Sequence, residues 1–585
     1  MPPLTDLVSI VQEDFAAGEV PAFAPHLMPE NGAWKLRNML LDDDGSAYKR
    51  GGSTLKSAAA LGAAGLRFLW DGFLAGGHRT LFASPAAFAV LDVDDSTVIN
   101  LGGGGMSDPL RPVVFDEILF VGDRMYGGSR IAAPYAVGTV SVVAGSTTVV
   151  GAGTAWVGHL DVGMLIQIDG DQIYAVAGVT DDTHLELAKP FGGATVAGLA
   201  YSAEAVMAIS SPYRSSQVYA TAGGRLIACV GARAYESNIG DAAAWLNPDG
   251  LETYHEVPGA EIHGADALAD YVVLFTSEGV WTISNVAFDL VDDFGDQQQQ
   301  LQPLSREIIL WSNEGIAAWQ NALVVPAVDG VWLVGLGQAP QLLSRSITPR
   351  YVAYVAAGYK TGLATVMKSH YLLPILDSSN NVVDLLVCRL DRPIRTARGV
   401  VWPWTHHRGS GANMVALATR IGGAPRQPVL LGAERGAGSR VVQLAEFVAD
   451  GPDVDHDGSA FEWDVISRDF QTGQLNRNLV KWLDARYELV GGEPTIEGSY
   501  ASDDRSPATS WGGLSWGAAT WTDVEDIGFA PLVGVDAPPS GGDQPHRWIA
   551  NKRVRFFRVR LRSSAPAKRA VVRSLQMWVR PSGRP

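Results

Sequence analysis

A short acidic loop is the segment whose residue types come nearest to a metal site. Asp453, Asp455 and Asp457 alternate ahead of Gly458, and Asp464 stands eleven residues after the first of them. Alternating carboxylates around a glycine turn can wrap a hard cation such as Ca²⁺. The last position of such a loop is normally a bidentate glutamate, however, and the flanking residues are typical of strands. The pattern therefore favours a polar turn, with the four aspartates as candidate calcium ligands.

Other patterns that could support catalysis or cofactor binding are incomplete. His406 and His407 are adjacent, and Cys, His or Asp partners at metal-ligand spacing are missing around them. The glycines from Gly102 to Gly105 are not followed by the Lys-Ser or Lys-Thr of a phosphate-binding loop. The sequence also lacks a paired-cysteine motif and a His-Glu-x-x-His motif. We therefore expect a protein without enzymatic activity and without a cofactor.

The composition indicates a turn-rich β protein. Among 585 residues, 47% are hydrophobic and 18% are charged, with 65 glycines and 17 tryptophans. Charged residues average about 25% in globular proteins, so this chain is poor in them. The formal net charge of -17 argues against a protein whose main task is to grip phosphate. An acidic wall repels DNA and leaves it free to slide, which is the behaviour of a conduit.

The two cysteines and the N-terminus bear on where the chain is made. Cys229 and Cys388 lie in apolar runs, which is typical of small buried residues in a reducing cytoplasm. The first fifteen residues carry acids where a signal peptide needs a basic segment. No stretch reaches the roughly 18 uninterrupted apolar residues of a membrane span. We expect a protein without an export signal and without a membrane span.

A repeated hairpin gives the main clue to the architecture. The segment from Asp270 to Trp281 matches that from Asn321 to Trp332, with equal spacing to a shared Gly-Val-Trp. Each copy consists of an apolar run, an acidic-Gly turn and a second run, which predicts two antiparallel strands. Looser copies occur at 79–90, 117–127, 225–235, 371–388 and 429–444. The spacing of about 40 to 50 residues predicts a β-propeller of six or seven blades, with stacked β-sandwiches as the alternative.

The chain divides into four parts on this interpretation. We expect an N-terminal extended segment at 1–40, a propeller platform at 41–137 and 203–445, and a C-terminal β domain at 446–585. Short Val/Thr strands with Gly and Asp turns predict a small β-sandwich at 138–202, inserted in a loop of the propeller. The Gln-rich run at 288–303 breaks the pattern and predicts an exposed loop. The fold class is therefore all-β.

Five arginines near the C-terminus predict a basic strand in an otherwise acidic chain. Arg553 and Arg555 share one parity, whereas Arg558, Arg560 and Arg562 take the other after Phe556-Phe557. A β-bulge at the two phenylalanines would give one continuous basic face. Three uses remain open for this face, which are a solvated surface, a salt-bridging contact with an acidic neighbour, and a DNA contact. The first two are favoured, and the arginines are candidate interface residues.

The order of several segments resembles that of the tail hub or nozzle proteins of short-tailed phages, also called DNA-stabilisation or tail tubular B-type proteins. The resemblance rests on Asn38-Met39, then Lys49-Arg50-Gly51-Gly52, then Val280-Trp281 and Asn313-Glu314-Gly315 ahead of Gly330-Val-Trp332. It ends with the strand from Lys552 to Arg562 and the terminal run from Ser574 to Arg584.

This resemblance implies a virion protein assembled in the host cytoplasm. Members of the family are propeller platforms that form six-fold rings under the portal and adaptor proteins. The implied partners are further copies of the chain, portal or adaptor proteins, tail fibre or needle proteins, and viral DNA that passes without tight binding. The segment 138–202 departs from the family pattern, which leaves its role open.

Two other functions stay open at this point. The first is a baseplate or fibre-hub protein of a long-tailed phage or gene-transfer particle, in which the insert and C-terminal domain serve as attachment points. The number of copies in the assembly would distinguish it from a nozzle, because a nozzle is expected to be a hexamer whereas fibres are usually three-fold. The second is a secreted, glycan-binding propeller lectin or a glycan hydrolase, which would need an export signal.

Overall fold

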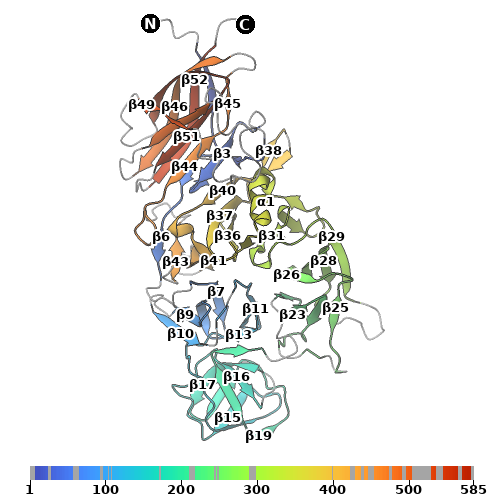
Figure 1. The fold of residues 1–585 in the computed structure, drawn as a ribbon. Helices are drawn as coiled ribbons and strands as arrows, with labels where there is room; N and C mark the ends of the chain where they lie inside the picture. The colour runs from blue at the N-terminus through green and yellow to red at the C-terminus, as the bar shows by residue number, and fades with distance from the viewer. Residues whose placement is uncertain are drawn as a thin grey trace.

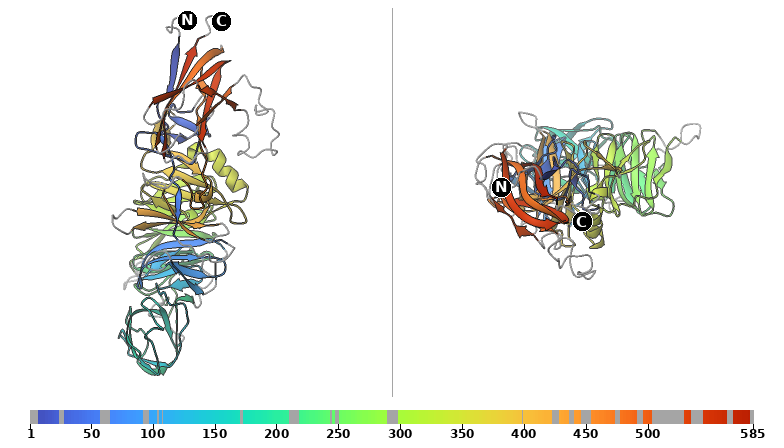
Figure 2. Two further views of the ribbon diagram at one scale, coloured as in Figure 1. Left: turned by 90° about the vertical axis from the view of Figure 1, so that its left-hand side faces the viewer. Right: turned by 90° about the horizontal axis from the view of Figure 1, so that it is seen from above.

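The computed structural model is built almost entirely of strands and has an elongated shape (Figures 1 and 2). It describes residues 7–23, 28–56, 65–91, 97–102, 105–106, 108–169, 173–209, 218–242, 245–246, 250–288, 298–397, 399–421, 428–435, 440–445, 454–472, 477–490, 496–502, 529–534, 544–563 and 569–581. Within these ranges the one α-helix is α1 (Thr348–Ala356). The described ranges also contain three short 3-10 helices, η3 (Asn313–Gly315), η4 (Ser344–Ser346) and η5 (Ser410–Ala412). The all-β fold class is therefore confirmed.

The first three blades are four-stranded antiparallel sheets. Blade 1 comprises β7 (Phe68–Leu74), β8 (Gly77–Ala83), β9 (Phe88–Leu91) and β10 (Val98–Gly102). Blade 2 comprises β11 (Val113–Phe115), β12 (Ile118–Val121), β13 (Arg124–Tyr126) and β21 (Val206–Ala208). Blade 3 comprises β22 (Val218–Ala222), β23 (Arg225–Val230), β24 (Arg233–Glu236) and β25 (Tyr254–Glu256).

Blades 4 and 5 contain the two repeated Trp hairpins. Blade 4 comprises β26 (Ile262–Leu268), β27 (Tyr271–Thr276), β28 (Gly279–Ser284) and β29 (Gln300–Ser305). Blade 5 comprises β30 (Ala317–Trp319), β31 (Ala322–Ala327), β32 (Gly330–Gly335) and β33 (Gln341–Leu342). Glycine is needed at the two hairpin turns for different reasons. Gly279 has a φ of +132°, whereas a Cβ at Gly330 would lie 2.5 Å from the side chains of Leu342 and Ser344.

Blades 6 and 7 complete the propeller with help from the N-terminus. Blade 6 comprises β34 (Lys360–Thr361), β35 (Thr365–Met367), β36 (His370–Leu376), β37 (Val382–Arg389) and β40 (Trp404–His407). Blade 7 comprises β41 (Met414–Ile421), β42 (Pro428–Glu434), β43 (Val441–Leu444) and, as its outermost strand, β6 (Ser53–Leu55). A strand from the start of the chain thus closes the last blade, as in ring-shaped propellers.

All seven sequence-predicted hairpins are the middle strand pairs of these blades. First strands of several neighbouring blades contact each other, including β11 beside β22, β22 beside β26 and, across the closure, β7 beside β41, and the blades are arranged around a common centre (Figure 1). The described residues thus form seven blades, in agreement with the expected six or seven. One expectation for this region is wrong in part. Of the run at 288–303, residues 300–303 are not a loop but belong to β29, the outermost strand of blade 4, whose half-exposed position explains its lack of an apolar face; residues 289–297 lie outside the described residues.

The insert lies between the third and fourth strands of blade 2. Its strands are β14 (Thr139–Val142), β15 (Thr148–Ala152), β16 (Leu165–Ile168), β17 (Ile173–Asp181), β18 (His184–Leu187), β19 (Val196–Leu199) and β20 (Tyr201–Glu204). The sheet runs β19-β14-β15-β18-β17-β16-β20, and its two end strands are consecutive in the chain. The small sandwich encloses its own core around buried Trp156, at the end of the molecule opposite the termini (Figure 1).

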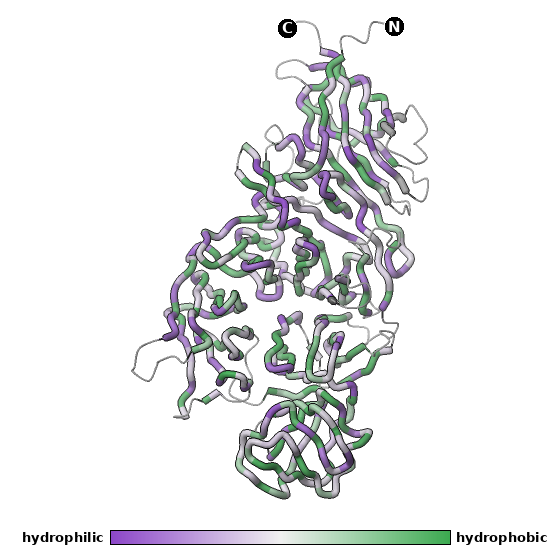
Figure 3. Tube along the Cα trace, turned by 180° about the vertical axis from the view of Figure 1, so that it is seen from behind, coloured by the Kyte–Doolittle hydropathy of each residue, from purple (hydrophilic) through white to green (hydrophobic). Residues whose placement is uncertain are grey.

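Two further sheets pack face to face at the other end. The first runs β4 (Met39–Leu41), β5 (Ala47–Lys49), β52 (Arg569–Arg580), β46 (Asn478–Val490), β50 (Gln544–Val554) and β49 (Val533–Gly534), with β1 (Val8–Gln12) beside β52. The second contains β3 (Gly32–Arg37), β44 (Trp463–Ser467), β51 (Phe556–Ser563), β47 (Glu497–Ser502) and β48 (Ala530–Pro531), with β2 (Gly18–Glu19) and β45 (Phe470–Gln471) at its sides. Figure 3 shows hydrophobic and hydrophilic residues alternating along these strands, as expected of sheets with one buried face.

The N-terminal segment differs from its expected role. Residues 1–40 were expected to form a separate extended segment, yet β1 to β4 are strands of the two C-terminal sheets. Strand β3 also pairs in parallel with β40 through Arg37 and His406, so blade 6 and the second C-terminal sheet form one continuous sheet. The C-terminal β domain is therefore built from both ends of the chain and is joined to the propeller by backbone pairing.

The predicted basic strand is two strands. β50 ends at Val554 and pairs with β46, whereas β51 begins at Phe556 and pairs with β44 and β47 in the other sheet. Val554 and Phe557 are both fully buried between the two sheets, which places the change of sheet at Arg555. A single strand with a bulge and one continuous basic face is therefore wrong.

Candidate functional sites

The candidate calcium loop is a structural turn. Its first described carboxylate, that of Asp455, forms an ion pair with an arginine. Both carboxylate oxygens of Asp455 accept hydrogen bonds from Arg50 at 3.0 Å, and both side chains are fully buried. The Arg50 guanidinium also stacks on Phe461, 3.7 Å from the ring centroid. Asp457 accepts hydrogen bonds from Ser410 and Ser459, which lower its pKa to about 2. These contacts agree with the polar turn favoured by the sequence.

The remaining predicted calcium ligands do not complete a site. Asp464 is fully buried in the continuous sheet and accepts two hydrogen bonds from Arg560, at 3.0 and 2.8 Å. The ammonium of Lys35 lies 3.8 Å from the same carboxylate. Asp453 lies outside the described residues. Within the described ranges, no group of three or more His, Cys, Asp or Glu residues could hold a metal ion.

A second buried cluster surrounds the adjacent histidines. Nδ1 of His406 lies 2.6 Å from a carboxylate oxygen of Glu19, which also pairs with Arg350. Burial and the neighbouring Arg350 charge hold the pKa of His406 well below its usual range. The ring of His407 lies on the other side of the strand, where Nε2 is 3.2 Å from the Met39 carbonyl oxygen. The pair therefore connects strands of the two modules.

A third ionic cluster extends this contact between the propeller and the C-terminal module into α1 and blade 6. Asp384 is buried in β37 and accepts hydrogen bonds from the guanidinium of Arg408 and the hydroxyl of Tyr354. Burial alone would raise the pKa of Asp384, but the nearby charges of Arg408 and Arg350 lower it overall. Together the three clusters form what we call the joint network, centred on Glu19, Arg50, Arg350, Asp384, His406, Arg408 and Asp455.

The five candidate interface arginines occupy different environments. Arg560 is buried against Asp464, while Arg558 donates to Asp469 at 2.6 Å and Arg562 to Glu497 at 2.7 Å. Arg553 and Arg555 are exposed at the corner between the two sheets. Three of the five therefore form ion pairs within the chain. Whether Arg553 and Arg555 contact a partner stays a prediction.

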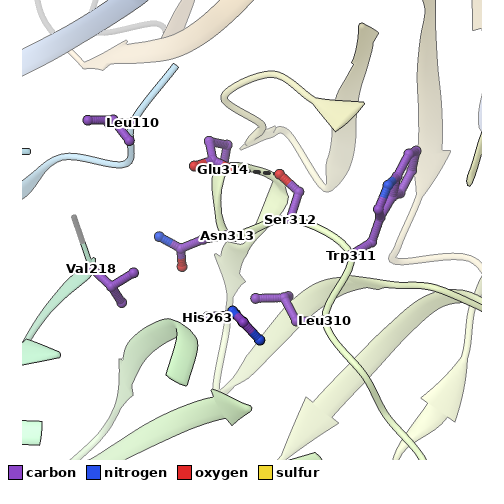
Figure 4. A pocket seen from close by; sticks show the side chains of 8 residues that line it. All are labelled: Leu110, Val218, His263, Leu310, Trp311, Ser312, Asn313 and Glu314. Carbon is purple, nitrogen blue, oxygen red and sulfur yellow. Dashed lines mark hydrogen bonds between the residues drawn. The ribbon is translucent and has the colours of Figure 1, made fainter. Parts of the chain in front are cut away.

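The propeller contains a cavity of about 400 Å³ beside its inner strands. It is lined by Leu110, Val218, His263, Leu310, Trp311, Ser312, Asn313 and Glu314 (Figure 4). The hydroxyl of Ser312 donates to the Glu314 carboxylate, and burial raises the pKa of that carboxyl. The Asn313 amide oxygen accepts from the Ala265 backbone, so this side chain also ties blade 4 to the segment before blade 5. The sequence did not single out this cavity, because its lining comes from four separate segments.

One short sequence motif is typical of a class of hydrolases. Gly513-Leu514-Ser515-Trp516-Gly517 has the spacing of a Gly-x-Ser-x-Gly nucleophile turn. The motif needs a strand followed by a helix to expose its serine. It lies outside the described residues, as does the Trp-dense segment 511–521. The motif therefore stays a sequence match without a structural context.

The strand pairings define the class of protein. It is an all-β propeller protein of seven blades, with a small sandwich inserted in blade 2 and a second β module made from both chain ends. No family model and no curated protein matches the sequence. No helix in the described part of the chain has the length and apolar character needed to cross a membrane.

Two solved structures are similar to this chain in part. Raptor from Chaetomium thermophilum matches 68% of this chain at 9% identity with a TM-score of 0.32, and the match spans 29% of the Raptor chain. Sqt1 from Saccharomyces cerevisiae matches 68% of this chain at the same identity and TM-score, and the match spans 98% of Sqt1. At this TM-score neither likeness bears on function, and the fold rests on the strand pairings.

Proposed function

We propose that this chain is a structural protein of a phage tail, a ring-forming hub or nozzle that continues the portal-adaptor channel, retains packaged DNA and conducts it during ejection. The order of sequence segments that resembles this family supports the proposal. The structural observation that carries it is the continuous sheet from blade 6 through β3 into the C-terminal module. Backbone pairing across a joint produces a rigid body, which suits a part that transmits load.

The joint network adds to this rigidity. Arg50 and Asp455 connect the N-terminal segment to the loop before the C-terminal module, while Glu19 and Arg350 connect it to α1. Breaking a buried ion pair by removing one partner is costly, because the other charge stays buried. Motion between propeller and C-terminal module would therefore be unfavourable. A rigid platform with both termini at one end and the insert at the other suits a subunit that contacts different neighbours along an axis (Figure 1).

The distribution of charge is compatible with a conduit. Residues 446–585 contain 17 Lys or Arg and 19 Asp or Glu, a net charge of -2, and residues 138–202 contain one and six, a net charge of -5. The remaining -10 belongs to the rest of the chain, since the total is -17. Six copies would carry 6 × -17 = -102 formal charges. If part of this charge faces a channel, DNA is repelled from the wall and passes without tight binding.

The experiment is to look for the protein in virus particles. Particles purified from a culture that carries the gene are analysed by mass spectrometry, and native mass measurement gives the number of copies in the released tail assembly. The proposal expects the chain in the tail fraction, in six copies. A three-fold assembly would favour the fibre-hub alternative. Absence of the chain from purified particles, with expression confirmed in the same cells, would contradict a virion role.

A further inference from the structure

The cavity beside the inner strands of the propeller is lined by a single acidic side chain. Among its described lining residues, Glu314 is the one acid, and none is lysine or arginine. The Glu314 carboxylate accepts hydrogen bonds from the Ser312 hydroxyl and from its own backbone amide, which are both neutral donors. Burial raises the pKa of this carboxyl, because neutral donors replace only part of the solvation that the ionised form loses.

A lysine close to this carboxyl is already paired with another acid. The ammonium of Lys360 lies 2.5 Å from a carboxylate oxygen of Asp108. The charge of Lys360 lowers the pKa of Glu314, whereas the charge of Asp108 raises it, so the two effects oppose each other. When Glu314 is ionised, the three residues carry one positive and two negative charges. A cation in the cavity would therefore balance their charge.

The walls beside the carboxylate are apolar. Leu110 comes from the segment before blade 2, Val218 is the first residue of β22 in blade 3, and Leu310 precedes η3. Figure 4 shows these three side chains around the same space as Glu314. His263 of β26 in blade 4 is exposed and Glu314 is half-buried, so the cavity is open to solvent. It therefore offers a carboxylate for a charged group and apolar walls for a short aliphatic chain.

The backbone that carries the carboxylate is held in place by neighbouring blades. The Asn313 amide oxygen accepts a hydrogen bond from the Ala265 backbone amide at 3.3 Å, and the Glu314 carbonyl accepts one from the Ala364 amide at 3.0 Å. A Cβ at Gly315 would lie 2.5 Å from a proline side chain of blade 5, so this turn is closely packed. Because the site is formed in advance, a ligand loses little affinity to ordering the protein.

We infer that this cavity binds a small organic cation, namely a primary ammonium ion on a short aliphatic chain. The ammonium lies against Glu314, and the chain lies against the three apolar side chains. An ammonium fits better than a guanidinium, because Ser312 already donates to one carboxylate oxygen and a guanidinium engages both. The ligand contacts residues in or beside blades 2, 3, 4 and 5, so binding stabilises the ring. The inference goes beyond the proposed function and does not depend on it.

Saturation-transfer NMR and calorimetry with n-butylammonium chloride test this site on the full chain. n-Butylammonium is expected to bind, whereas n-butanol and butyrate, which have a similar chain without the positive charge, are expected to bind at least about tenfold more weakly. Glu314→Gln is expected to weaken n-butylammonium binding by about tenfold or more, because a charge-assisted hydrogen bond is lost. The matched control is Glu307→Gln, which changes an exposed acid of the same segment between blades 4 and 5 and is expected to leave the affinity unchanged.

Thermal unfolding with and without n-butylammonium provides a second readout. The ligand is expected to raise the unfolding midpoint of the unchanged and Glu307→Gln proteins but not that of Glu314→Gln. The melts without ligand show whether each variant is folded. Val218→Phe, which fills part of the cavity and keeps its charge, is expected to weaken binding as well.

Three results would overturn the inference. They are equal n-butylammonium affinity of the unchanged and the folded Glu314→Gln proteins, equal binding of n-butanol and n-butylammonium, and no binding of n-butylammonium by the folded, unchanged protein. None of them bears on whether the chain is found in tail particles, so this inference and the proposed function fail separately.

Discussion

Arg50 and Asp455 lie 405 residues apart in the sequence and form a bidentate ion pair with both N–O distances at 3.0 Å and both side chains fully buried. The pair joins the segment that precedes β6 to the loop that precedes the C-terminal sheets. It lies where the closing strand of the propeller meets the second β module. The same N-terminal segment therefore closes the ring and attaches the module that follows it.

Replacing Asp455 by Asn is expected to destabilise the protein by about 3–5 kcal/mol, because the Arg50 charge would stay buried without a counter-charge. Chemical denaturation followed by tryptophan fluorescence measures the change. Asp457→Asn is the control, since this neighbouring carboxylate is exposed and bonds only to serine hydroxyls and a backbone amide. Equal effects of the two substitutions would contradict the role given to the buried pair.

Gly51 tests the closure of the ring. A Cβ at this position would lie 2.2 Å from the carbonyl oxygen of Ala445, immediately beside the pairing of β6 with β43. Gly51→Ala is therefore expected to destabilise the propeller by about 1–3 kcal/mol, through overpacking against backbone that does not move freely. Gly178→Ala is the matched control, because no atom lies within 4 Å of its Cβ. Thermal unfolding of both variants measures the difference in stability. A Gly51→Ala protein as stable as the unchanged protein would argue against tight packing where β6 closes the ring.

Buried His255 is expected to make the stability of the propeller depend on pH. Burial alone would lower its pKa, but hydrogen bonding to Glu236 and the charge of that residue raise it overall. A histidine whose folded pKa exceeds the unfolded value of about 6.5 adds stability below that value, and the gain is lost as pH rises through the folded pKa. The free energy of unfolding should therefore fall as the pH rises through the folded pKa of His255. The His255→Gln substitution should make the free energy of unfolding depend less on pH. A variant with the same pH profile as the unchanged protein would contradict this assignment.

The two thiols should be inert in the folded protein. Burial raises the pKa of Cys229 to about 12 and raises that of Cys388 as well, so neither forms the reactive thiolate at neutral pH. Thiol titration with a chromogenic disulfide is expected to detect almost no reaction in buffer and two thiols per chain in denaturant. Rapid reaction under native conditions would mean that one of the blades opens readily.

The insert should be dispensable for the propeller. Its strands pair among themselves, and blade 2 keeps the pairing of β13 with β21 on either side of it. Replacing residues 138–204 by a short Gly-Ser linker is expected to leave the remaining chain folded, with a cooperative thermal transition followed by circular dichroism. The isolated insert is expected to fold as well, because its seven strands pair with one another and enclose a buried core of their own. Aggregation of the shortened protein would show that the insert stabilises blade 2.

The sequence predicted the blades because each middle hairpin carries its own signal. The apolar runs and Gly turns of segments such as 270–283 are local, and alternating burial follows from them. The closing strand β6 was missed, since Ser53–Leu55 is three residues long and has no periodicity of its own. The corner at Arg555 was interpreted as a bulge, because a slip in alternation looks the same whether the chain bulges or changes sheet.

The joint network was not predictable from sequence spacing. Glu19 and Arg350 are 331 residues apart, and nothing near either residue in the chain indicates the other. The candidate calcium ligands show the converse case. Asp455 and Asp464 are close in sequence and share a plausible motif, yet distant arginines neutralise each of them. Which acidic and basic residues form ion pairs is determined by the pairing of strands from both ends of the chain.

The position of the chain in a virus particle tests the central claim most directly. Cryo-electron microscopy of intact particles would resolve seven-bladed rings and the attached β module at the resolution where strands separate. The account predicts six copies around the axial path of the DNA, below the portal and adaptor. Density for the chain at a site away from that axis, or in a fibre with three-fold symmetry, would contradict it.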